Sequence, residues 1–387
     1  MRFRSVLAVM AALIAVTLSA AQAVYADGGR GHRDDDDGDR RGSAVFVQTN
    51  ELDGNRILVF DRASSGRLSP AGSFSTGGNG GNVAPGTASD RLGSQGSLVY
   101  DEKHRLLFAV NAGSDTLAVF RVRGNRLKLK EVLPSGGDFP ASVAVHDNLV
   151  YVLNAGGAGI VQGFVIHGNR VRPLEGSARS LGLANTDPPN FLTSPGQVGF
   201  TPSGRELIVT TKASKSTIEV FHVGRDGRLS ESPVVNPSAT PVPFAFTFDQ
   251  SGRLVMGEAA MSAVTTYDLN RDGTLANPQS LSDNQVALCW IVRARGFFYV
   301  SNTGSNTLSG YRIDGNGTPS LVGATGIVAT TGEGPIDMTT AAGGRFLYAQ
   351  TGAAGTVEEF SVNGDGTLTR LGVVTGLPVG QEGIAAS

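Results

Sequence analysis

From Ala44 onward, short apolar runs alternate with short turns rich in Gly, Ser, Asn and Asp. A run such as LLFAV at 106–110 is followed by a turn, and then by a second run that alternates apolar and polar residues. Both kinds of run are typical of β-strands. The apolar spacing of three and four residues that marks an amphipathic helix is almost absent. The pattern therefore predicts an all-β protein, and the 53 glycines agree with a chain that has many turns.

The same unit of strands and turns recurs seven times. The clearest copies lie at 106–132, 297–317 and 346–372. In every copy the alternating run ends on an aromatic residue, at Phe60, Phe120, Phe164, Phe221, Tyr267, Tyr311 and Phe360. The first and last of these are 300 positions apart over six steps, so the mean period is 50 residues. A strand-rich repeat of about 40–50 residues is typical of β-propeller blades.

Each unit contains four predicted strands, A to D. Strand B is apolar, and strand C is the alternating run whose final aromatic residue we expect to pack between blades. A tight Asp-Gly-x-Leu turn follows strand C at 226–229, 272–275 and 365–368. Glycine in such a turn supplies the positive φ that a hairpin needs. Strand D then leads through a longer loop into the next strand A.

The two ends of the repeat region complement each other. Ala44 begins directly with a B-type strand, and residues 383–387 match an A strand with no B strand after it. We expect the two segments to pair in one blade and so close the ring. The predicted fold is a seven-bladed β-propeller of four-stranded blades, formed by one domain at 44–387.

The residues before Ala44 have a different character. Residues 1–26 combine a basic start, an apolar run of 11 residues and small residues before Ala26, which is the pattern of a secretory signal peptide. Residues 27–43 contain no aliphatic residue and no Phe, Tyr or Trp. They are therefore expected to form a disordered linker. Its run Asp34–Asp37 lacks the later glutamate of an EF-hand loop. We expect a secreted, periplasmic or cell-envelope protein without a membrane span after cleavage.

The net charge, the single cysteine and the positions of the histidines limit which binding partners, cross-links and metal sites are expected. The net charge is −2, and becomes −4 without the two arginines of the signal segment, so neither nucleic acid nor an anionic membrane is an expected partner. Cys289 is the single cysteine, so no intramolecular disulfide can form. The five histidines are scattered, which predicts no metal site, and we expect no cofactor. A monomer that binds a small molecule or a cell-envelope partner is expected.

The seven units, the Asp-Gly-Thr-Leu turns and the Gly-Arg-x-Leu-x-Val pattern between strands A and B resemble the seven-bladed lactonase propellers over residues 44–387. That family includes the propeller-type 6-phosphogluconolactonase and the fungal carboxymuconate cyclase, with exported bacterial relatives. The resemblance implies the propeller fold and an activity on a lactone. It also implies histidines where the inner strands start, but those positions read Gly96-Ser97-Leu98, Pro140-Ala141-Ser142, Pro195-Gly196-Gln197, Pro243-Phe244-Ala245 and Pro335-Ile336-Asp337. The activity therefore does not carry over residue by residue.

In a propeller, the B–C and D–A loops lie on one face, beside the central channel. The D–A segments 75–96 and 182–196 are the longest, and long loops on a rigid scaffold are the usual place for binding. Few ionisable residues map near this face. They are Lys212 and Glu258 at the ends of B strands, and Glu333, Asp337 and Glu382 at the starts of A strands.

These residues could hydrolyse a lactone if they converge on one cavity. Glu258 or Glu382 would be the general base on water, and Lys212 would stabilise the oxyanion. The candidate ligand-binding residues around them are Gln95, Asn111, Asn154, Gln197, Trp290, Asn302 and Asp337. The alternative is that the charged groups cap strand ends, line a water-filled channel or pair with one another, and that Cys289 and Trp290 are core residues.

Two functions remain open from the sequence. The first is an exported lactonase-like hydrolase or cycloisomerase, which the family resemblance favours. The second is a non-catalytic secreted propeller that binds a ligand, a glycan or a protein partner, which the missing histidines favour. Whether the protein is an enzyme is therefore undecided at this level.

Overall fold

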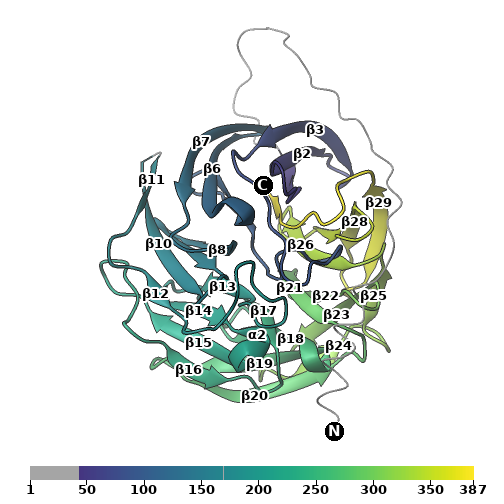
Figure 1. The fold of residues 1–387 in the computed structure, drawn as a ribbon. Coiled ribbons are helices and arrows are strands. Elements are labelled where there is room, and N and C mark those ends of the chain that lie inside the picture. The colour runs from purple at the N-terminus through teal and green to yellow at the C-terminus, as the bar shows by residue number, and fades with distance from the viewer. Residues whose placement is uncertain (1–42, 169) are drawn as a thin grey trace, which may run out of the picture.

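Seven antiparallel sheets stand in a ring around a central axis (Figure 1). The computed structural model describes residues 43–168 and 170–387. The predicted signal peptide at 1–26, and the predicted linker except for Ser43, lie outside the described residues. Over the described ranges, no helix has the length and apolarity to cross a membrane.

Each blade runs from an outer strand at the edge of the ring to an inner strand at the channel. In that order, blade 1 contains β3 (Leu68–Ser75), β2 (Arg56–Arg62), β1 (Ala44–Gln48) and β30 (Ile384–Ala386). Blade 2 contains β7 (Arg126–Pro134), β6 (Thr116–Arg123), β5 (Leu106–Asn111) and β4 (Leu98–Asp101). Blade 3 contains β11 (Arg170–Pro173) and β12 (Arg179–Ser180), both paired with β10 (Ile160–His167), then β9 (Leu149–Asn154) and β8 (Pro140–His146). Blade 4 contains β16 (Val234–Pro237), β15 (Thr217–His222), β14 (Glu206–Thr210) and β13 (Gln197–Phe200).

Blades 5 to 7 repeat this order. Blade 5 contains β20 (Leu275–Ser282), β19 (Ala263–Leu269), β18 (Leu254–Glu258) and β17 (Pro243–Phe248). Blade 6 contains β24 (Pro319–Leu321) and β25 (Ile327–Thr330), both paired with β23 (Thr307–Ile313), then β22 (Phe297–Asn302) and β21 (Leu288–Ala294). Blade 7 contains β29 (Leu368–Val374), β28 (Thr356–Val362), β27 (Phe346–Thr351) and β26 (Pro335–Ala341). Three single-turn helices lie in B–C loops, namely η1 (Ala112–Ser114), α2 (Lys212–Lys215) and η2 (Ala259–Met261).

The predicted ring closure is confirmed. Strand β30 pairs antiparallel with β1, with Ile384 opposite Val47 and Ala386 opposite Val45. The backbone N–H of Gln48 donates to Gly383 O at 2.8 Å, which extends the pairing beyond the strand. The last strand of the chain therefore supplies the channel-side strand of the first blade.

Apolar side chains fill the spaces between blades, as the repeat predicts. All seven aromatic residues that end strand C are buried, with exposures of 2 % or less. One cluster joins Phe46 and Val59 of blade 1 to Leu107 and Phe120 of blade 2, and equivalent clusters join the blades that follow. The core is thus divided into layers between neighbouring sheets, which leaves the channel-side strand ends free to carry polar groups.

The Asp-Gly-x-Leu turns also connect neighbouring blades. Within the turn at Asp365, the Oδ1 atom accepts from Thr367 N and Oγ1 at 3.0 and 2.7 Å. The turn glycine has a φ of +91°, and its carbonyl accepts the hydroxyl of Tyr299 of blade 6 at 2.9 Å. Tyr151 and Tyr348 bond the corresponding turns of the following blades in the same way, at Gly227 and Gly66. The repeated turn therefore stabilises the hairpin between strands C and D, and it also bonds that hairpin to the tyrosine of the preceding blade.

The variant Tyr348→Phe tests this connection. Tyr348 is fully buried and its hydroxyl donates to Gly66 O at 2.7 Å. Its loss leaves that carbonyl without a donor and is expected to lower the free energy of unfolding by about 1 kcal/mol. Urea denaturation measures the change. Tyr100→Phe is the control, since that ring packs on Phe46 at 5.8 Å and its hydroxyl makes no hydrogen bond to the described residues. Equal stability losses in the two variants would contradict this role of the turn.

Candidate functional site

Two long loops on the face that carries the B–C and D–A connections are bonded to each other. The plug loop, residues 76–97, joins β3 to β4, and its dark blue trace passes through the middle of the ring beside β21 (Figure 1). The cap loop, residues 181–196, joins β12 to β13. Ala84 N donates to Pro189 O at 2.8 Å, and Phe191 N donates to Ala84 O at 3.1 Å. The two segments that the sequence singled out as binding loops therefore form one covering over the channel.

Lys212 and Glu382 hold opposite sides of one peptide group in the plug loop. The Lys212 Nζ atom donates to Gly93 O at 2.7 Å. Glu382 accepts from Ser94 N at Oε1, at 3.4 Å, and from Leu92 N at Oε2, at 2.7 Å. Both side chains are buried, with exposures of 1 % and 0 %. The 93–94 peptide thus accepts a hydrogen bond from an ammonium group at its carbonyl oxygen and donates one to a carboxyl group through its N–H.

The position of Lys212 is set by the end of β14. Its backbone has a φ of +45°, which is costly for a residue with a side chain and is typical of functional sites. Its Nζ atom lies 5.0 Å from the ring centroids of both Phe191 and Phe244, and it also donates to Phe191 O at 2.7 Å. Burial lowers the pKa of Lys212 to about 8. The two rings and two carbonyls favour the ammonium form that this burial opposes.

The charges of two carboxyl groups, Asp90 and Glu382, act on this ammonium, and Asp337 in turn interacts with both of them. Asp90, on the plug loop, accepts from Gly93 N at 2.6 Å through Oδ1, while its Oδ2 is buried without a partner among the described residues. Burial raises the pKa of both Asp90 and Glu382, and the negative charge of Asp90 raises the pKa of Glu382 further. Burial raises the pKa of Asp337 to about 8. Burial therefore favours the protonated form of Asp337 at neutral pH.

Asp90 is the member of this cluster that the sequence reasoning missed. It is the only acidic residue between 75 and 96, and Arg91 is the only basic one. An isolated pair of ionisable residues in an otherwise uncharged loop was the available signal. Placing it at the channel would have required the path of the loop.

Two further predicted residues, Trp290 and Gln95, lie at the same place. Trp290 Nε1 donates to Ser94 O at 2.9 Å, and its ring packs on Phe244 with centroids 4.9 Å apart. Gln95 Oε1 accepts from Ile291 N at 2.9 Å. The neighbouring Cys289 is buried, and burial together with the charge of Asp90 raises the pKa of its thiol. Side chains from blades 1, 4 and 6 thus converge on residues 92–95.

Glu258, the other predicted base, lies in a different environment. It ends β18 and accepts hydrogen bonds from the hydroxyls of Ser238, Thr240, Thr265 and Tyr267. No ion pair or hydrogen bond within the described ranges joins it to Lys212. Four hydroxyl donors occupy its oxygens, an arrangement that stabilises the B–C connection of blade 5.

The remaining predicted ligand residues bind their own surroundings. Asn111 donates to Thr116, Asn154 to Ser135 O and Ile160 O, Gln197 to Phe246 O, and Asn302 to Thr307 and Ser309. Among residues 43–168 and 170–387, no group of three or more His, Cys, Asp or Glu side chains could hold a metal ion.

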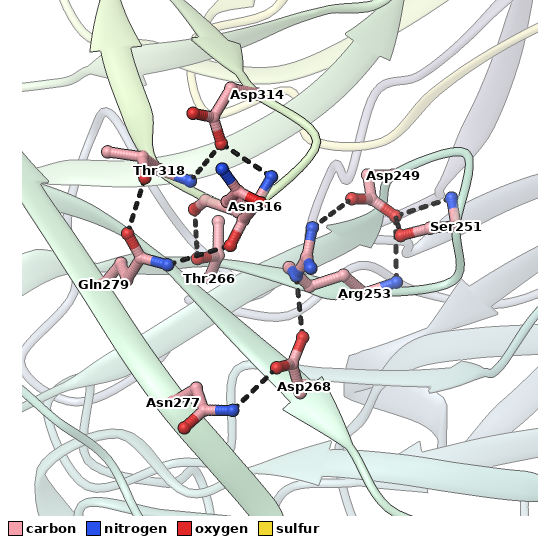
Figure 2. Close-up of polar contacts among 11 residues, drawn as sticks. Asp249, Ser251, Arg253, Thr266, Asp268, Asn277, Gln279, Asp314, Asn316 and Thr318 are labelled. Carbon is pink, nitrogen blue, oxygen red and sulfur yellow. Dashed lines mark hydrogen bonds and ion pairs between the residues drawn. The ribbon is translucent and has the colours of Figure 1, made fainter.

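Charged residues also gather on the opposite face, where A–B and C–D turns meet. Arg253 binds Asp249 at 3.2 Å and Asp268 at 2.8 Å, and Asn277 donates to Asp268 at 2.9 Å (Figure 2). Beside them, Thr266 of blade 5 donates to Gly317 O of blade 6 at 2.6 Å. The charged and polar groups here form ion pairs and hydrogen bonds with one another. The channel cluster is therefore the better candidate for a functional site.

Comparison with known proteins agrees with this architecture. Residues 264–381 match the family described as "Lactonase, 7-bladed beta-propeller". The chain has no significant match among curated proteins. A candidate 6-phosphogluconolactonase from Bacteroides uniformis has 18 % identity, with 90 % of this chain and 100 % of that chain covered and a TM-score of 0.71. A periplasmic gluconolactonase from Pseudomonas aeruginosa has 15 % identity, with 89 % and 98 % covered and a TM-score of 0.63.

At these identities the structural likeness establishes the fold, and the reaction has to be argued from the site. The family match begins in β19 of blade 5 and runs through blades 6 and 7, and the strand order shows seven blades in the ring. The chain is therefore a seven-bladed β-propeller whose C-terminal part matches the lactonase propeller family.

Proposed function

We propose that this protein hydrolyses a small lactone at the channel, with Lys212 and Glu382 as the reacting side chains. The observation that carries the proposal is that both side chains form hydrogen bonds with the 93–94 peptide group. Lys212 Nζ lies 2.7 Å from a carbonyl oxygen, and Glu382 lies on the other side of the same planar group. A lactone is also a planar acyl group, with a ring oxygen where the peptide has its nitrogen.

The chemistry follows from these two positions. Glu382 in its ionised form takes a proton from a water molecule, whose oxygen attacks the acyl carbon. The Lys212 ammonium stabilises the negative charge that forms on the carbonyl oxygen. The bond from the acyl carbon to the ring oxygen then breaks, and Glu382 returns its proton to that oxygen. Water has been added across one C–O bond, and the product is an open-chain hydroxy acid.

Of the two bases that the sequence left open, the geometry favours Glu382 over Glu258. The oxygens of Glu258 accept hydrogen bonds from four hydroxyl groups, two on β19 and two on the loop between β16 and β17. Glu382 accepts from two backbone N–H groups of the plug loop and interacts with Asp90 of the same loop, and these contacts are lost if that loop moves. Its raised pKa, caused by burial, makes it a stronger base than an exposed glutamate.

A binding function without chemistry is the second candidate. The observation in its favour is that the channel cluster already holds an amide group, through Lys212, Glu382 and Trp290, without cleaving it. A propeller that binds an oxygen-rich ligand through the same donors and acceptor would look identical in this state.

We further propose that the protein acts outside the cytoplasm. This rests on the signal-peptide pattern of residues 1–26, which lie outside the described part of the chain. The structural likeness to a periplasmic gluconolactonase is compatible with that placement.

Lactone hydrolysis by residues 27–387 tests the proposal. A panel of aldonolactones and aryl lactones is followed by pH-stat. Turnover above the spontaneous rate is expected, with a loss of about 100-fold or more in Lys212→Met and in Glu382→Gln, because each removes a group that acts in the transition state. Lys215→Met is the matched control, since this half-exposed lysine in the same helix binds Glu219.

Turnover that survives both variants would contradict the assigned residues. Absence of turnover, combined with saturable binding of a lactone or sugar acid that both variants abolish, would favour the binding function instead.

A further inference from the structure

The channel cluster is closed to solvent in this structure. Lys212, Glu382 and Cys289 are 1 %, 0 % and 4 % exposed, and the plug loop covers them. The proposed reaction requires a substrate and a water molecule to reach Lys212 and Glu382. The plug loop must therefore move before the site can work.

The plug loop is built so that one part of it can move. Residues 77–81 include four glycines, and Gly93 and Gly96 at the other end have φ values of +64° and +89°. Residues 95–97 are bonded to the ring, since Ser142 Oγ donates to Gln95 O at 2.6 Å and Val143 N donates to Gly96 O at 2.9 Å. Within the segment 82–92, the backbone of Ala84 bonds the cap loop, and Ser89 lies against Gly352 of blade 7.

Two polar atoms in this segment favour its release. Asp90 Oδ2 and Arg91 Nε are buried and have no hydrogen-bond partner among the described residues. Both would gain water if the segment moved outward. Against this, the Leu92 side chain is fully buried in the apolar cluster that also contains Val83. Leu92 and Val83 are therefore the apolar anchors of the closed state.

We propose that residues 82–94 form a reversible gate, held shut by the Leu92 side chain and by the bonds from Lys212 and Glu382 to the 93–94 peptide. Opening frees Lys212 Nζ and the Glu382 carboxyl group, and a carbonyl-bearing ligand then takes the place of Gly93 O. The gate inhibits its own site by occupying it. The need for opening and the identity of that ligand both rest on the proposed function.

The single cysteine of the chain supplies a measurement of opening that is independent of turnover. Cys289 lies beneath the plug loop, and the charges of both Asp90 and Lys212 act on its thiol. A thiol reagent reaches it either when the gate opens or when the whole protein unfolds. These two routes differ in how strongly urea accelerates them, because urea sensitivity scales with the surface exposed.

The experiment follows the reaction of residues 27–387 with 5,5′-dithiobis(2-nitrobenzoate) at pH 8, over urea concentrations below the unfolding transition. The labelling rate is expected to rise with urea at a small fraction of the slope for global unfolding. Leu92→Ala is expected to accelerate labelling without urea at least about tenfold, since a buried leucine is lost from the closed state only. Leu107→Ala is the matched control, because Leu107 is equally buried but lies in β5.

A labelling slope equal to that of global unfolding would overturn the gate, and so would equal acceleration by the two variants. The wild-type urea slope alone decides the matter if Leu92→Ala does not fold. Gated labelling without lactone turnover would refute the hydrolase and keep the gate. Turnover without gated labelling would refute the gate and keep the hydrolase.

Discussion

A chain that lacks residues 381–387 is expected to unfold at least about 10 °C below the full-length protein. The deletion removes β30 and its three register pairs with β1, and it removes the buried side chains of Ile384 and Glu382. Blade 1 loses its channel-side strand, and β1 becomes an open sheet edge inside the ring. Loss of these contacts is expected to cost several kcal/mol. At about 2–4 °C per kcal/mol for a protein of this size or somewhat smaller, the shift exceeds 10 °C.

Differential scanning calorimetry on the two chains measures this shift. The control is removal of Ser387 alone, which eliminates the backbone bond from Ser387 N to Ala44 O at 2.9 Å but leaves β30 in place. A change of only a few degrees is expected for that chain. An unchanged melting curve for the longer deletion would refute the role of β30 in closing the ring.

The stability advantage of the variant Asp337→Asn over the wild type is expected to grow by about 4 kcal/mol between pH 5 and pH 8. Burial raises the pKa of Asp337 to about 8, from 3.8 in an exposed carboxyl. Between these two values the folded state holds a proton that the unfolded state has lost, so stability falls as the pH rises. At about 1.4 kcal/mol for each pH unit, most of the interval between 3.8 and 8 contributes. Asparagine has no such proton to lose.

Urea denaturation of both proteins at pH 5, 6.5 and 8 tests this expectation. Asp90 and Glu382 contribute in the same direction, because burial also raises their pKa, so the Asp337→Asn protein should still lose some stability as the pH rises. Asp53→Asn, the same substitution in an exposed turn, is the control. Wild-type and Asp337→Asn stabilities that run parallel with pH would show that Asp337 does not retain a proton in the folded state.

The fold was predictable because its signals are local and repeated. A strand period of two, a turn with a required glycine and an aromatic residue at each strand C all depend on neighbours in sequence, and each occurs seven times or nearly so. The closure was predictable because Ala44 starts a B strand and the C-terminus supplies an unpaired A strand. The structure confirms both, with β1 paired to β30.

The candidate site was predictable only in part. Strand order alone places Lys212, Glu382 and Trp290 on the channel side, and the structure brings these three to residues 92–95. The glycine-rich plug loop has no periodicity, and tertiary contacts decide its path, so Asp90 could not be placed. Glu258 occupies a strand end equivalent to others on that face, but the hydroxyls around it come from Ser238 and Thr240, whose position depends on the preceding loop.

The pairing that closes the ring has a consequence for the order of folding. The bond between Ala44 N and Ser387 Oγ joins residues 343 positions apart, whereas the hairpins of the other blades join near neighbours. Contacts between distant residues pay a larger loop-closure entropy and form slowly. The other six blades consist of strands that are consecutive in sequence, so they can form from local hairpins. Blade 1 is complete only when β30, at the end of the chain, pairs with β1. During that interval the inner edge of β1 can accept the last strand of a second molecule, so ring closure competes with strand exchange between chains at high concentration.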